Sequence, residues 1–84
     1  YYGERGASLY CLQDTAAAVQ NILLAAASLG LSTCWVGAFR ERAVMEALNL
    51  PRSRRPVALI PVGYARSQPK APPRRPVEEA AHWL

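Results

Sequence analysis

The amino-acid sequence predicts a mixed chain of helices and strands with one long apolar helix at the centre of a larger body. Three features favour this. A helical pattern over residues 15–29 is apolar on nearly every side, two runs rich in β-branched residues follow it, and a proline-rich arm ends the 84-residue chain. Hydrophobic residues make up 51% of the sequence, which is enough for a packed core and argues against a disordered chain.

The first two segments are a loop and the long helix. Residues 1–12 are expected to form a packed loop, because Gly3 and Gly6 interrupt the segment and no hydrophobic period appears. Helix 15–29 has two candidate N-caps, Asp14 and Thr15, and ends before Gly30, where a left-handed C-cap residue belongs. An 84-residue chain can hardly enclose such a helix, so we expect a second polypeptide, in a dimer or a longer chain, to cover it.

A strand and a short helix come next. Residues 33–39 are predicted to form a strand by their β-branched and aromatic content. Gly37 weakens that strand unless something approaches its backbone. Residues 41–49 have helical spacing, with Asn49 as the expected C-cap and Pro51 as a stop.

The last two segments are a second strand and the arm. Residues 57–64 form an apolar run without alternation, which predicts a strand covered on both faces, and Pro61 indicates an edge or a bulge. Residues 65–84 are predicted to form an extended arm, stiffened by proline and ending in an apolar anchor at Trp83 and Leu84.

Charge is concentrated in one half of the chain. Residues 1–51 carry a net charge of −1 and residues 52–84 one of +5, which together give +4. Nucleic acid, a phosphate-bearing cofactor and plain solubility are open explanations for the basic half. Nucleic-acid binding is disfavoured, because Glu78 and Glu79 interrupt the basic residues and Tyr64 is the only aromatic residue between 52 and 75.

Several other classes are disfavoured by length and spacing. The longest apolar run is six residues, at 22–27, whereas a membrane span needs about 20. No secretory signal is visible, so we expect a cytoplasmic protein without a membrane partner. Cys11 and Cys34 match no zinc or redox-pair spacing and are expected to be buried reduced thiols, with a disulfide as the alternative.

No catalytic side-chain set and no metal site is predicted, so an enzyme built on this chain would depend on a cofactor. Trp35, Val36 and Gly37 can present backbone N–H and C=O groups to a flat ligand, because glycine has no Cβ in the way. The alternative is a glycine at a sheet twist. Arg74 and Arg75, on a stiff proline-flanked segment, suit a phosphate, with a solvated basic spacer as the alternative.

These motifs, taken in order, resemble the C-terminal half of the FMN-dependent nitroreductase family. They are QDTAAAVQNILLAA at 13–26, LGL at 29–31, CWVGAF at 34–39, PVALIPVGY at 56–64, PRRPVEE at 73–79 and HW at 82–83. The long helix and the WVGAF strand, taken together, are a fairly specific signal of this family. The family's N-terminal half, with its Arg- and Ser-containing phosphate motif, has no counterpart in these 84 residues.

The resemblance implies an α+β nitroreductase-like fold built as an intertwined homodimer. It implies that helix 15–29 lies at the dimer centre and that the arm reaches over the partner. It also implies FMN at the interface, with Trp35, Val36 and Gly37 beside the flavin ring and Arg74 or Arg75 at its phosphate. The implied activity passes electrons from a nicotinamide through FMN to a nitro, quinone or similar acceptor.

Several alternatives stay open. The missing half is consistent with a truncated gene product, a fragment, or one piece that pairs with a complementary chain. The functional alternative is a non-catalytic dimerisation or assembly module with a vestigial flavin site. The azoline-oxidising branch of the same flavin fold is a nearer alternative. Its matching helix begins with a Glu-Ala-Gly-His-like stretch where this chain has QDTA at 13–16, so the nitroreductase branch is preferred.

Overall fold

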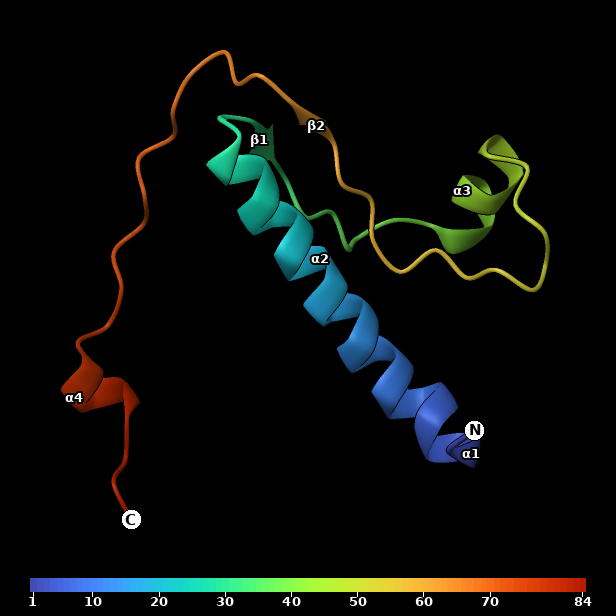
Figure 1. The fold of residues 1–84 in the computed structure, drawn as a ribbon, viewed down its shortest axis with the longest axis horizontal. Helices are drawn as coiled ribbons and strands as arrows, with labels where there is room; N and C mark the ends of the chain where they lie inside the picture. The colour runs from blue at the N-terminus through green and yellow to red at the C-terminus, as the bar shows by residue number, and fades with distance from the viewer.

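The computed structural model describes residues 1–84 and is dominated by one long helical rod (Figure 1). Helix α1 (Gly3–Arg5), the π-helical turn η1 (Gly6–Tyr10) and helix α2 (Cys11–Ser28) follow one another without a break. The 18 residues of α2 alone span about 27 Å. The helix predicted at 15–29 therefore forms, but it begins much earlier.

The loop expected over residues 1–12 is wrong, because the rod starts at Gly3. Tyr2 packs edge-on against Tyr10, with ring centroids 5.7 Å apart, and Arg5 Nε donates a hydrogen bond to the Tyr10 hydroxyl at 2.9 Å. Gly6 is helical, with φ −62°. A Cβ on Gly6 would lie 3.0 Å from the Tyr2 Cβ, so this glycine permits close packing rather than interrupting the helix.

Asp14 and Thr15, the two expected N-cap candidates, both lie inside the rod. The Thr15 hydroxyl donates to the Cys11 carbonyl at 2.7 Å, the back-bonding that threonine makes within helices. Because the preceding residues already have helical dihedral angles, no cap is required at this point.

Two helices end in the same C-cap geometry. Gly30 lies two residues beyond the end of α2, and Asn49 lies two residues beyond the end of helix α3 (Glu41–Ala47). Both residues have positive φ, 75° and 50°. In each case the next backbone N–H returns to the carbonyl five residues earlier, at 2.9 and 2.8 Å, which is the Schellman arrangement. The two left-handed residues that terminate these helices are the ones expected from the sequence, each directly after the C-cap residue, Leu29 or Leu48.

The sheet is a short antiparallel ladder. Strand β1 (Ser32–Thr33) pairs with β2 (Val62–Gly63), and an isolated bridge between Val36 and Leu59 continues the same register. The strands predicted at 33–39 and 57–64 therefore face each other, but regular pairing is confined to one end. In this register Cys34 lies opposite Pro61, and proline has no N–H with which to complete the pair.

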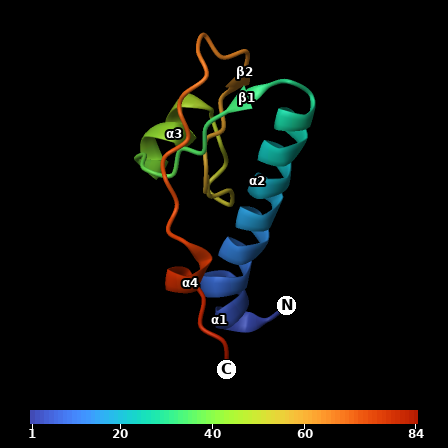
Figure 2. The same cartoon turned by 90° about the vertical axis from the view of Figure 1, so that its left-hand side faces the viewer.

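Residues 40–56 form the segment that connects the two strands of the ladder beyond the Val36–Leu59 bridge, and we call this segment the arch. It carries helix α3, which stands to one side of the rod in Figure 1. The last segment, residues 65–84, leaves β2 as an extended arm with a single helical turn, α4 (Val77–Ala80). Figure 2 shows the arm descending toward the end of the molecule that also holds the N-terminus.

The core of the single chain is thin. Only Val19 and Ala26 are buried, whereas Ile22, Leu24 and Leu29 are 48%, 60% and 74% exposed. The radius of gyration is 16.8 Å, against about 12 Å for a compact domain of this length. The chain alone does not provide the enclosure expected for the long helix.

The expectation that both thiols are buried is wrong, and the small core is the reason. Cys11 and Cys34 are both free and both exposed, because too few side chains surround either residue to bury it. Among the helices, none has the length and apolar content needed to cross a membrane.

Candidate flavin site

The predicted strand residues 35–37 carry a free backbone edge. Val36 and Leu59 exchange two hydrogen bonds, at 2.9 and 3.0 Å, so the polar backbone groups of Val36 are occupied. On an antiparallel strand the neighbouring groups point to the opposite side. Trp35 and Gly37 accordingly have no backbone partner within the chain. The groups available to a ligand are those of Trp35 and Gly37 and not those of Val36.

The side chains around this edge leave room for a flat group. A Cβ built on Gly37 would meet no atom within 4 Å. Trp35 is 42% exposed and lines an apolar crevice of about 80 Å³ between α2 and the returning strand. The other residues that line this crevice are Leu12, Thr15, Ala16, Val19, Val57 and Ala58.

The two arginines expected at a phosphate lie elsewhere in the single chain. Arg74 and Arg75 are exposed on the arm, where Arg74 Nη1 donates to the Pro72 carbonyl at 3.2 Å. No hydrogen bond or ion pair joins either arginine to a residue outside the arm. One copy of the chain therefore does not bring the predicted ring contacts and phosphate contacts together.

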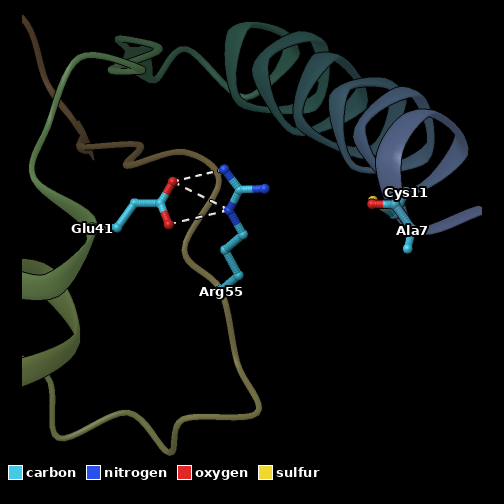
Figure 3. Close-up of polar contacts among 4 residues, drawn as sticks. All are labelled: Ala7, Cys11, Glu41 and Arg55. Atoms are coloured by element: carbon cyan, nitrogen blue, oxygen red, sulfur yellow. Dashed lines mark hydrogen bonds and ion pairs between the residues drawn. The ribbon is translucent and has the colours of Figure 1, made fainter. Parts of the chain in front are cut away.

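A bidentate ion pair closes the base of the arch, and sequence reasoning did not find it. Arg55 donates from Nη2 to Glu41 Oε1 at 2.8 Å, and from Nε to Oε1 and Oε2 at 3.2 and 3.1 Å (Figure 3). These hydrogen bonds lower the pKa of Glu41 and raise that of Arg55. The partners are 14 positions apart, so no helical or strand period signals the pairing.

Figure 3 also includes Cys11 on the rod, where its thiol donates to the Ala7 carbonyl at 2.8 Å. Nowhere do three His, Cys, Asp or Glu residues gather as a metal site would require. The largest hollow, about 540 Å³, lies on the arch and not at residues 35–37. It is lined by Arg42, Met45, Glu46, Asn49, Leu50 and Arg52. We interpret it as a solvated face, because its charged pair, Arg42 with Glu46, is 93% and 67% exposed.

Comparison with known proteins shows the same family along most of the chain. The Nitroreductase family model matches residues 1–64. The chain is 38% identical over 71 residues to the oxygen-insensitive NADPH nitroreductase of Salmonella typhimurium, covering 82% of this chain and 30% of that protein. It is also 38% identical over 86 aligned residues to the 4-nitrobenzoate reductase of a Nocardioides species, covering 95% and 35%.

A solved structure agrees with these relatives. The nitroreductase family protein of Streptococcus pneumoniae TIGR4 superimposes with a TM-score of 0.88 at 28% identity, over 99% of this chain and 42% of that one. The chain belongs to the nitroreductase family, as its sequence motifs predicted. It spans about a third of the length of the curated relatives described above.

Proposed function

We propose that this chain is part of an FMN-dependent oxidoreductase. The protein would take electrons from a nicotinamide cofactor and deliver them through FMN to a nitro, quinone or similar acceptor. The names of two relatives, an NADPH nitroreductase and a 4-nitrobenzoate reductase, support this class of reaction. The two free thiols are consistent with the reducing cytoplasm that we expect for it.

The free edge at Trp35 and Gly37 is the observation that supports a flavin. An isoalloxazine is flat and carries hydrogen-bonding atoms along its polar edge, which suits a strand whose outward N–H and C=O groups have no partner. The open space at Gly37 is where any larger residue would place a Cβ. The residues present therefore fit the group, and bound FMN would supply the hydride and electron transfer that no side chain here can supply.

The chain's own residues would bind and orient. Trp35 and Gly37 would donate and accept backbone hydrogen bonds, and the Val36 side chain would only contact the ring. Arg74 or Arg75 would hold the phosphate through charge-assisted hydrogen bonds.

We further propose a homodimer as the working form. Leu24 on α2 and Leu29 directly after it have no cover within the chain. The arm ends in Trp83, which is 89% exposed. A second copy would cover both surfaces, and its arm would bring Arg74 and Arg75 toward the edge at 35–37, from which they are separated in one copy. The buried apolar area of such a dimer would offset the low burial of the monomer.

Flavin retention tests the proposal. The protein at its natural length is purified with excess FMN, and bound flavin is measured by visible absorbance. A Gly37→Val variant fills the open space and should reduce retention about tenfold or more. Gly63→Val is the matched control, because Gly63 also has open space around its missing Cβ but lies in β2, away from the 35–37 edge.

Retention in the wild type and in Gly63→Val, with loss in Gly37→Val, supports the proposal. A wild-type protein that forms a stable dimer but retains no flavin would favour the alternative, a non-catalytic assembly module. Equal loss in both glycine variants would show that the 35–37 edge is not the flavin contact.

A further inference from the structure

The arch is attached to the ladder at a narrow base. The chain leaves the ladder after Val36 and returns at Leu59, the pair that exchanges two backbone hydrogen bonds. Beyond this pair no backbone hydrogen bond joins residues 37–40 to residues 55–58. Continuing the ladder register places Arg55 opposite Arg40, immediately beside Glu41.

Side chains close the base where the backbone does not. Glu41 is the first residue of α3, so its carboxylate connects the start of that helix to the returning strand. Arg55 binds it with two nitrogens, and this fork-to-carboxylate geometry fixes orientation as well as distance (Figure 3). The side chains are 46% and 64% exposed, so the pair adds little to overall stability. Its effect is local, because it holds the two sides of the base at one spacing.

We infer that Glu41 and Arg55 are positioning residues that fix the Val36–Leu59 bridge and thereby the edge at 35–37. With the base open, the last bridge before the arch would fray, and the outward groups of Trp35 and Gly37 would lose their fixed direction. The effect on a bound flavin rests on the proposed function. The effect on the bridge does not depend on a flavin.

The test compares two isosteric changes in one helix. Glu41→Gln removes the charge at the base of the arch. Glu46→Gln is the matched control, since Glu46 is paired with Arg42 within α3 at 2.9 Å and has no contact with the base. A third protein, Glu41→Arg combined with Arg55→Glu, restores opposite charges in exchanged positions. Each is made in the protein at its natural length.

Two readouts are measured on each protein. The first is amide hydrogen exchange at Val36 and Leu59 without flavin, and the second is the midpoint potential of bound FMN. We expect Glu41→Gln to speed exchange at both amides about twofold to fivefold and to shift the potential. We expect Glu46→Gln to change neither, and the charge exchange to recover at least part of the protection.

The outcomes separate the inference from the proposed function. Unchanged exchange in Glu41→Gln, or equal acceleration in Glu46→Gln, overturns the inference. If Glu41→Gln speeds amide exchange but leaves the midpoint potential of FMN unchanged, the positioning role is overturned. The ion pair then stabilises only the base of the arch. A wild-type protein that holds no flavin contradicts the proposed function instead, while the exchange readout still decides whether the pair fixes the bridge.

Discussion

Cys34 lies opposite Pro61 in the register that pairs β1 with β2 and Val36 with Leu59. Those flanking pairs define an antiparallel ladder in which every second position exchanges two hydrogen bonds. The Cys34–Pro61 position is one of these, and Pro61 cannot donate. One residue therefore divides two predicted strands into a two-residue ladder and an isolated bridge.

Replacing Pro61 with valine should join the two parts of the ladder. The new N–H at position 61 can donate to Cys34, and we expect its exchange to be slowed about tenfold relative to an unprotected amide. The thermal midpoint should change little, because a hydrogen bond worth about 1 kcal/mol is offset by the lost rigidity of proline, about 0.4–1 kcal/mol. Pro56→Ala, outside the ladder positions, is the control. Fast exchange of the amide introduced by Pro61→Val would contradict the register.

The exposed side of α2 gives a prediction about association. Leu24 is 60% exposed in one chain, so Leu24→Glu should be harmless to a monomer. If a second copy buries it, the introduced carboxylate should weaken dimerisation at least about tenfold. Sedimentation equilibrium measures the change. Ser53→Glu adds the same charge at an exposed position of the arch, away from α2, and should leave the dimer intact. Equal association of both variants would place the interface elsewhere.

The arm arginines give a prediction about ligand chemistry. Loss of both Arg74 and Arg75 to alanine should weaken FMN binding about tenfold to a hundredfold, because charge-assisted hydrogen bonds to a phosphate are lost. Riboflavin, which has no phosphate, should bind both proteins equally. The control removes Arg66 and Lys70, two cationic residues of the same arm. A similar loss in this control would indicate general electrostatic attraction and not a phosphate contact.

The Glu41–Arg55 pair gives a prediction about pH. The hydrogen bond from Arg55, with a smaller contribution from its charge, holds the pKa of Glu41 below 4.5. The Glu41 carboxylate therefore binds a proton less readily in the folded protein than in the unfolded chain. The stability that the ion pair contributes is complete above pH 4.5 and is lost as the pH falls through the lowered pKa.

Amide exchange at Val36 and Leu59 provides the measurement. After correction for the intrinsic rate, exchange should be constant above pH 4.5 and accelerate below it. Glu41→Gln should lack this step while Glu46→Gln retains it. A step of the same size in Glu41→Gln would assign it to another carboxylate.

Local chemistry was enough to predict the ends of the helices. Gly30 and Asn49 were expected at C-caps, and both adopt the positive φ that such caps require. Pro61 was expected at an edge or a bulge, and it divides the ladder. Each of these features depends on one residue and its own backbone, so a single sequence carries the information.

Features that depend on contacts between segments were missed. Gly3 and Gly6 resembled loop residues, because the packing of Tyr2 on Tyr10 that makes Gly6 useful in a helix has no sequence period. Cys34 was expected in a buried strand, but the cover that a buried strand needs is not supplied by this chain.

The candidate site shows the same division. Trp35 and Gly37 were singled out by residue type, but the loss of the Val36 backbone groups to Leu59 depends on strand register. The ion pair between Glu41 and Arg55 depends on how the arch closes, which no local pattern specifies.

Sedimentation velocity followed by visible flavin absorbance tests the central claim most directly. The protein at its natural length is loaded with FMN, freed of excess ligand and sedimented. We expect the flavin absorbance to move as a single boundary at the mass of two copies, because the free edge of one copy and the arm of the other would hold FMN together. Flavin left behind at the meniscus, or a flavin-carrying boundary at the mass of one copy, would contradict it.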